Sequence, residues 1–235
     1  TLFFESIGAV LLMIRFIPEF GIGRGIWYGI FHSISAFCNA GFDLMGENGA
    51  YQSLIRYSDD WLVNTVIMLL IIIGGIGFLV WDDLSVKKFQ WKKYHLHTKI
   101  VLSTTGFLII GGAVLFLILE KNNVLAGMPV KEQILCSLFH SVTARTAGFN
   151  TTDTGALTEG SKLVTMILMF IGGSPGSTAG GMKTTTFTVL ILNAIATFRS
   201  RENVEAFGRR LDHYVIKNAA TIAMLYFTMF FCGGI

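Results

Sequence analysis

The sequence predicts an all-α integral membrane protein made of repeated units, and three observations support this fold class. Of its 235 residues, 52% are hydrophobic and 14% are charged, whereas a soluble domain carries about 25% charged residues. Residues 61–80 and 100–119 contain no charge, and about 20 apolar residues in a helix cross the hydrocarbon of a bilayer. A motif that begins with FHS and ends with AGF occurs twice, at 31–42 and 139–149, which indicates a duplicated unit.

Taken in chain order, the apolar runs give the expected elements. A run opens the chain at residues 2–17, and the span at 61–80 follows a long connection. The span at 100–119, an interrupted run at 162–198 and a closing run at 215–235 complete the series. The chain begins without an initiator Met and stops inside the closing run, so we expect it to be an excerpt of a longer protein.

Positive charge is concentrated in two of the connections between these runs. Residues 81–99 hold five lysines and residues 198–217 hold five basic residues, while the longer connections at 19–60 and 120–161 hold two and three. Cytoplasmic loops carry an excess of Lys and Arg. We therefore expect 81–99 and 198–217 on the cytoplasmic side, where their charges serve either as a solvated topology signal or as a docking surface.

Each copy of the repeated motif overlaps the end of a short segment that is about half apolar. Residues 25–37 and 131–144 are too short to cross a bilayer as helices, so we expect re-entrant helices that enter from the outer side and turn back at AGF. Non-helical backbone at that depth must be buried or line a watery cavity, and carbonyls in such a turn can replace the water shell of a cation. We predict a cation filter near Gly41 and Gly148; the alternative is a tight turn at a helix end.

The run at 162–198 is too long for one ordinary crossing, because its 37 residues would form a helix of about 55 Å. Its centre, GGSPGSTAGGMK at 172–183, is rich in Gly and Pro, which disfavour helix interiors. We predict a flexible loop near mid-membrane that lies across the permeation path. One alternative is a phosphate-binding loop, which needs a preceding strand and a lysine one position earlier; another is a glycine-rich packing face.

Three segments together resemble a known family: FHSISAFCNAGFD, SVTARTAGFNTTD and GGSPGSTAGGMKTTT. They resemble the Trk/Ktr/HKT superfamily of potassium transport proteins, and most of all its bacterial Ktr-type membrane subunit. The resemblance implies four units of helix, re-entrant pore helix and helix around one pseudo-fourfold ion pore. This chain is similar to the second unit (1–97), the third unit (98–214) and the start of the fourth (215–235). The resemblance further implies a homodimer, a cytosolic nucleotide-binding regulatory ring of the RCK type, and no covalently bound cofactor.

By this resemblance, two sets of residues take functional roles. The ion filter, with K+ at backbone carbonyls near Gly41 and Gly148, is formed by Asn39, Ala40, Gly41, Phe42, Thr146, Ala147, Gly148 and Phe149. The gating loop is formed by Gly172, Gly173, Ser174, Pro175, Gly176, Ser177, Thr178, Ala179, Gly180, Gly181 and Lys183. Lys183 is either a tethered cation that competes for an ion site or a lysine that pairs with a nearby carbonyl.

The sequence therefore indicates a multi-pass plasma-membrane protein that is not an enzyme, has no nucleic acid partner and takes up K+ through a channel-like pore, with Na+ as an activating ion. One alternative is a sodium or mixed sodium/potassium transporter of the same architecture. Another is a secondary transporter with one discontinuous helix in each repeat. In the first unit, the span at 61–80 carries only GGIG at 74–77, without Pro or a polar loop, which favours a gate in the second unit alone.

Overall fold

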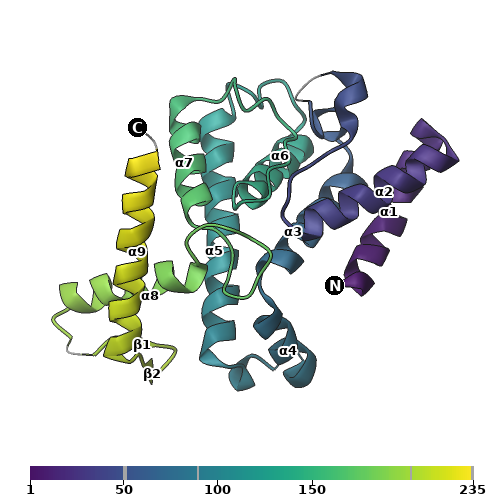
Figure 1. The fold of residues 1–235 in the computed structure, drawn as a ribbon. Helices are drawn as coiled ribbons and strands as arrows, with labels where there is room; N and C mark the ends of the chain where they lie inside the picture. Colours follow the sequence, from purple (N-terminus) through teal and green to yellow (C-terminus); the bar gives the residue numbers. More distant parts are fainter. Residues whose placement is uncertain (50–51, 89, 202, 234–235) are drawn as a thin grey trace.

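The computed structural model describes residues 1–49, 52–88, 90–201 and 203–233, and these are mostly helical (Figure 1). The α-helices are α1 (Leu2–Phe20), α2 (Ile22–Phe37), α3 (Trp61–Gly75), α4 (Phe78–Lys87), α5 (Leu96–Glu120), α6 (Val130–Thr143), α7 (Glu159–Phe170), α8 (Thr184–Phe198) and α9 (His213–Gly233). Short 3-10 turns lie at Met45–Asn48, Ile55–Tyr57 and Trp91–Lys93. A small antiparallel hairpin, β1 (Glu205–Ala206) and β2 (Arg209–Arg210), precedes α9 and pairs Glu205 with Arg210.

The first repeat consists of α1, the short helix α2 and α3, which pack against one another (Figure 1). Ser33 in α2 ties the first two helices together, because its Oγ donates to the carbonyl oxygen of Glu5 at 2.7 Å. Helix α3 begins after Asp60, whose carboxylate accepts hydrogen bonds from the backbone N–H groups of Leu62 and Val63. Such an N-cap satisfies two donors that the first turn of a helix leaves free.

The second repeat has the same order of elements: the long helix α5, the short helix α6, and then α7 and α8. Ser141 in α6 matches Ser33 in the sequence repeat, and its Oγ donates to the carbonyl oxygen of Ile109 in α5 at 2.8 Å. At the other end of α5, the wholly buried carboxylate of Glu120 accepts from the N–H and the hydroxyl of Thr158, the N-cap of α7. The two helices are thus fastened side by side.

The helices that follow the two predicted filter segments are both interrupted. The predicted break in 162–198 is confirmed, since α7 ends at Phe170 and α8 begins at Thr184; the segment before the loop is a helix and not the strand of a phosphate-binding motif. The expectation that only the second unit carries a break is wrong: the span at 61–80 is bent as well, since α3 ends at Gly75, α4 begins at Phe78, and the angle between them is 97°. The reason is that Gly77 adopts a positive φ of 90°, which ends the helix.

Membrane-crossing helices can be assigned by length and composition within the described residues. Helices α5 and α9 are each long and apolar enough to cross a bilayer, and α3 with α4 passes the same test as one bent span. Helices α7 and α8 are shorter because the loop divides them. The predicted unit boundaries at 98 and 215 lie two residues after the starts of α5 and α9.

The two repeats share one hydrophobic core. Phe139, Val142 and Phe149, from α6 and the segment after it, are buried in the same cluster as Phe16, Leu54, Ile67 and their neighbours in the first repeat. This shared core brings the segments that follow α2 and α6 next to each other.

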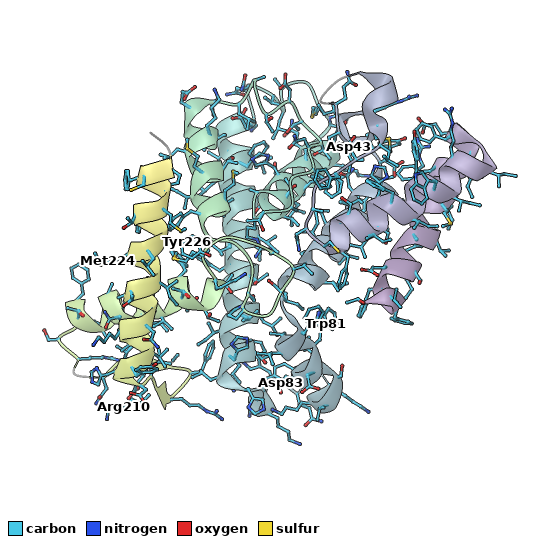
Figure 2. The ribbon with its side chains drawn as sticks, in the orientation of Figure 1. Asp43, Trp81, Asp83, Arg210, Met224 and Tyr226 are labelled. Carbon is cyan, nitrogen blue, oxygen red and sulfur yellow. The ribbon has the colours of Figure 1, made fainter. Side chains whose placement is uncertain are left out.

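The long and the basic connections lie at opposite ends of the molecule. The long connections meet where the N–H of Leu54 donates to the carbonyl oxygen of Asn150 at 2.8 Å. The basic connections meet where the rings of Trp91 and Phe207 make an edge contact. Figure 2 shows Asp83 and Arg210, from those two connections, at the same end and Asp43 toward the other.

Candidate ion pathway

The two predicted filter segments have matching backbone conformations. Asn39 and Gly41 in the first repeat have φ values of 50° and 70°, and the equivalent Thr146 and Gly148 in the second have φ values of 73° and 92°. A non-glycine residue in this left-handed region is uncommon and costs energy. Its occurrence at the same position of both repeats indicates that the conformation belongs to the repeated unit.

A matched hydroxyl fixes the end of each segment. Ser35 Oγ donates to the carbonyl oxygen of Phe42 at 2.8 Å, and Thr143 Oγ1 donates to that of Phe149 at 2.7 Å. Ser35 and Thr143 occupy the same place in the sequence repeat. Each of these two carbonyl oxygens therefore has one of its two acceptor sites used by a hydroxyl of the preceding short helix.

The carbonyl oxygens of residues 39–41 and 146–148 receive no hydrogen bond from the described part of the chain. Among the residues that the structure describes, no N–H or O–H group donates a hydrogen bond to any of these six oxygens. Of the six residues, Ala147 is buried, Asn39, Gly41 and Thr146 are half-buried, and Ala40 and Gly148 are exposed, so most of these oxygens belong to residues that solvent reaches. The described residues also contain no group of three His, Cys, Asp or Glu side chains that could hold a metal ion. The carbonyls are thus the candidate cation ligands.

The two segments touch backbone to backbone. A Cβ atom placed on Gly41 would lie 2.3 Å from the carbonyl oxygen of Ala147 and 2.9 Å from the Cα of Gly148. Gly41 also has a positive φ, so no residue with a side chain can replace it and keep the two segments this close. The two phenylalanines differ: Phe149 is wholly buried in the shared core, whereas Phe42 is 70% exposed.

The predicted gating loop lies in the connection between α7 and α8, residues 171–183. Its two ends pair with each other, since the N–H of Gly172 donates to the carbonyl oxygen of Met182 and the N–H of Met182 donates to that of Phe170, both at 3.0 Å. Inside the base of the loop, the hydroxyl oxygens of Ser174 and Thr184 lie 3.0 Å apart. The loop is therefore a closed, internally bonded structure that crosses the middle of the molecule (Figure 1).

The loop is bound to the break between α3 and α4. The N–H groups of Ser174 and Thr178 donate to the carbonyl oxygens of Gly75 and Gly74, at 2.9 and 3.3 Å. In return, the N–H of Phe78 donates to the carbonyl oxygen of Gly176 at 3.0 Å. The GGIG stretch at 74–77 is a visible signal of irregular backbone at this contact, but nothing local in it indicates what binds there.

The loop also contacts both filter segments. Asn39 Nδ2 donates to Thr178 Oγ1 at 2.8 Å, and the N–H of Gly180 donates to Thr146 Oγ1 at 3.1 Å. The structure thus brings together the two sets of predicted residues, from the ends of α2 and α6 and from the connection after α7. Of the two readings of Lys183, pairing with a carbonyl is the one observed, since its Nζ donates to the carbonyl oxygen of Ala179 at 2.7 Å.

The polar side chains of the pore helices have structural partners. His32 Nδ1 lies 2.7 Å from the carbonyl oxygen of Tyr28, and His140 Nε2 lies 2.8 Å from Thr165 Oγ1. Arg145, next to the second filter segment, differs from them. It is 6% exposed, and the described residues supply neither a salt bridge nor a hydrogen-bond partner for its Nε.

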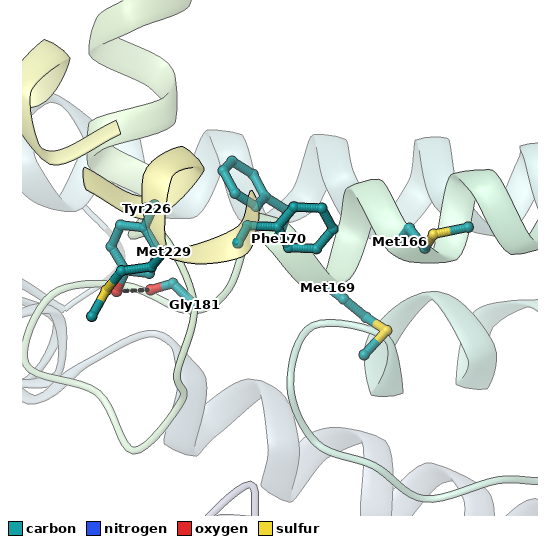
Figure 3. A pocket seen from close by; sticks show the side chains of 7 residues that line it. Met166, Met169, Phe170, Gly181, Tyr226 and Met229 are labelled. Carbon is teal, nitrogen blue, oxygen red and sulfur yellow. Dashed lines mark hydrogen bonds between the residues drawn. The ribbon is translucent and has the colours of Figure 1, made fainter. Parts of the chain in front are cut away.

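A pocket of about 430 Å³ lies beside the loop, between α7 and α9 (Figure 3). Its lining is largely apolar and comes from Met166, Met169, Phe170, Gly181, Tyr226, Met229 and Phe230. Tyr226 donates its hydroxyl hydrogen to the carbonyl oxygen of Gly181 at 3.1 Å, which ties α9 to the end of the loop. A lining of this kind does not suit a hydrated cation, so the pocket is separate from the candidate filter.

Over its whole length, residues 1–235, the chain matches the family model "TrkH: Cation transport protein". It is 44% identical over 219 residues to the potassium/sodium uptake protein NtpJ of Enterococcus hirae, which covers 93% of this chain and 47% of that protein. It is 38% identical over 231 residues to the Ktr system potassium uptake protein B of Bacillus subtilis, which covers 97% and 51%.

The fold is also that of a solved structure. The chain resembles the crystal structure of the potassium transporter TrkH from Vibrio parahaemolyticus with a TM-score of 0.77 and 20% sequence identity, over 98% of this chain and 48% of that one. The chain spans about half the length of the relatives it matches. These matches confirm the resemblance to the Trk/Ktr proteins and a multi-pass membrane protein: the chain belongs to the TrkH family of cation transport proteins.

Proposed function

We propose that the full protein takes up K+ across the plasma membrane through a pore whose filter includes the carbonyls of residues 39–41 and 146–148. The observation that carries this proposal is the absence of any donor to those six oxygens within the described residues. A cation that binds there regains from carbonyl groups what it loses from its water shell. Two relatives with more than a third of their aligned residues identical are named as potassium uptake proteins.

A second candidate, uptake of Na+ together with K+, has one specific observation in its favour. The relative with 44% identity is named a potassium/sodium uptake protein. The filter glycines Gly41 and Gly148 suit K+. A fourfold filter needs four such segments, however, and this chain supplies two of them. Na+ as an activating ion is part of the same proposal.

The loop at 172–183 is the proposed gate. Its contacts with Asn39, through the Thr178 hydroxyl, and with Thr146, through the N–H of Gly180, support a position against both filter segments, where the loop obstructs the path of an ion. Loops of this kind are tolerated at membrane depth when they are buried in protein or border water. The first repeat supplies part of the protein that surrounds the loop, through the carbonyl oxygens of Gly74 and Gly75.

The rival proposal, a secondary transporter with paired discontinuous helices, gains one argument from the break at Ile76 and Gly77. In that mechanism the unwound carbonyls of each repeat coordinate the coupling ion. Here the carbonyls of Gly74 and Gly75 accept from the N–H groups of the loop, so they are occupied. This occupancy favours a docking role for the break over ion coordination.

The basic connections at 81–99 and 198–217 are proposed to face the cytoplasm and to contact an RCK-type nucleotide-binding ring. Their meeting at one end of the molecule, through Trp91 and Phe207, supports a common side. A homodimer of the full protein is the proposed assembly.

The test uses the full-length protein in liposomes, with K+ and Na+ gradients imposed separately. We expect K+ flux to exceed Na+ flux, and we expect deletion of residues 173–181 to raise K+ flux and to loosen its control by nucleotide. Size-exclusion chromatography of each variant provides the control for folding. Unchanged or lower flux from a monodisperse deletion variant contradicts the gate, and equal K+ and Na+ flux in the wild type favours the mixed transporter.

A further inference from the structure

Thr178 joins the gating loop to the first repeat at three points. Its Oγ1 donates to the carbonyl oxygen of Phe37 at 2.9 Å and accepts from Asn39 Nδ2 at 2.8 Å, while its N–H donates to the carbonyl oxygen of Gly74 at 3.3 Å. A hydroxyl offers one donor and two acceptor sites, so the donor and one of the acceptor sites are used. We propose that Thr178 is the latch that holds the loop closed, an inference that rests on the proposed role of this loop as the gate.

The acceptors exist because two helices of the first repeat end at the same place. Helix α2 ends at Phe37 and α3 ends at Gly75, and the last carbonyls of a helix have no partner within it. Buried carbonyls need donors from elsewhere. Thr178 and Ser174 supply them to Phe37, Gly74 and Gly75. The bend of 97° between α3 and α4 therefore leaves carbonyl acceptors that bind the loop.

Gly74 is the residue that lets these three elements meet. A Cβ atom at this position would lie 2.0 Å from the carbonyl oxygen of Phe37 and 2.8 Å from Thr178 Oγ1. Contacts this short are not found in proteins, and the first involves backbone that cannot yield cheaply. The absence of a side chain at Gly74 is thus a requirement of the latch rather than of the helix break, which Gly77 provides.

The latch reaches the filter directly. Asn39, which binds Thr178, is the residue with a positive φ that opens the first filter segment. Its repeat equivalent Thr146 also has a positive φ and accepts a hydrogen bond from the N–H of Gly180, two residues after Thr178. The same position of both repeats is therefore bonded to the loop. Movement of the loop away from the path breaks one hydrogen bond at each filter segment, so gate opening changes the support of the filter.

The experiment compares Thr178 with a threonine outside the filter and the loop, in the full-length protein reconstituted in liposomes. Thr178→Val keeps the branched shape and removes the hydroxyl, and Thr197→Val in α8 makes the same change where the hydroxyl donates to the carbonyl oxygen of Asn193 in its own helix. We expect Thr178→Val to raise K+ flux about fivefold or more, because two hydrogen bonds of the closed state are lost. Thr197→Val stays at the wild-type flux, and Thr178→Ser, which restores the hydroxyl, returns most of the control.

The outcomes separate this inference from the one it rests on. If Thr178→Val leaves the flux unchanged while deletion of 173–181 raises it, the latch is wrong and the gate stands. If both leave it unchanged, the gate itself is wrong. Should Thr178→Val fail to fold, Asn39→Leu removes the same hydrogen bond from the filter side; a raised flux supports the latch and an unchanged flux overturns it. A Thr178→Ser variant as leaky as Thr178→Val also overturns the latch.

Discussion

Replacement of Gly41 by alanine tests the filter more sharply than replacement of Gly148. Both glycines have a positive φ, and an alanine in that region costs about 1–2 kcal/mol. Only Gly41 adds a severe contact, since its Cβ would lie 2.3 Å from the carbonyl oxygen of Ala147, about 1 Å closer than ordinary contact allows. For Gly148 the nearest atom is the Cα of Gly41 at 3.3 Å.

The expected effects follow from these magnitudes. The shared backbone strain lowers the population of the native filter by a factor of about 5–30 in both variants. In Gly41→Ala, the carbonyl of Ala147 must in addition move by about 1 Å, and this carbonyl is one of the proposed K+ ligands. We therefore expect Gly41→Ala to lose K+ over Na+ selectivity by a larger factor than Gly148→Ala.

The assay measures K+ and Na+ flux separately, with the full-length protein in liposomes. Gly106→Ala in α5 is the matched control, because nothing lies within 4 Å of its Cβ position. An equal loss of selectivity in Gly41→Ala and Gly148→Ala would refute the steric part of the reasoning. Unchanged selectivity in both would show that the two glycines only make turns.

Three further predictions concern residues around the filter and the loop. Ser35→Ala combined with Thr143→Val removes the hydrogen bonds to the carbonyl oxygens of Phe42 and Phe149, so we expect K+ over Na+ selectivity to fall. Thermal unfolding of the purified protein should show a loss of stability of about 1 kcal/mol per site. Retained selectivity contradicts the role given to these two hydroxyl groups. Lys183→Met removes the bond to the carbonyl of Ala179, and we expect K+ flux in liposomes to rise by less than it does in Thr178→Val, because that bond lies within the loop. Glu120→Gln turns an amide N–H₂ group toward hydrogen-bond donors in either orientation, because one carboxylate oxygen accepts from Thr158 and the other from Asn123 and Val124, at a cost of about 1–3 kcal/mol; an unchanged unfolding temperature contradicts this.

Much of the fold was predictable because its determinants are local. The length of an apolar run decides whether it crosses a bilayer, which separated the short helices α2 and α6 from the long helix α5. The Gly and Pro residues of 172–183 marked the end of α7 at Phe170 and the start of α8 at Thr184 within two residues. The FHS…AGF repeat predicted that the two segments after α2 and α6 match, and their shared positive φ values confirm the match; their role as a filter stays a prediction.

The site in the first repeat that binds the loop was not predictable from the sequence. Asn39 and Thr178 are 139 residues apart, and nothing in either local segment identifies the other as its partner. GGIG at 74–77 was visible, but whether such a stretch bends by 97° depends on whether the freed carbonyls find donors, and here the donors come from the second repeat. The hydroxyls of Ser35 and Thr143 were likewise visible as a repeated position, without an indication of their acceptors.

The burial of Phe149 has a consequence for biogenesis. This side chain completes the core of the first repeat together with Phe139 and Val142, yet all three are synthesised after that repeat. The first repeat therefore has an unfilled interior until the second is made, and a chain cut after residue 97 lacks part of its own core. In such a fragment, Phe16, Leu54 and Ile67 lose the side chains that cover them from the second repeat.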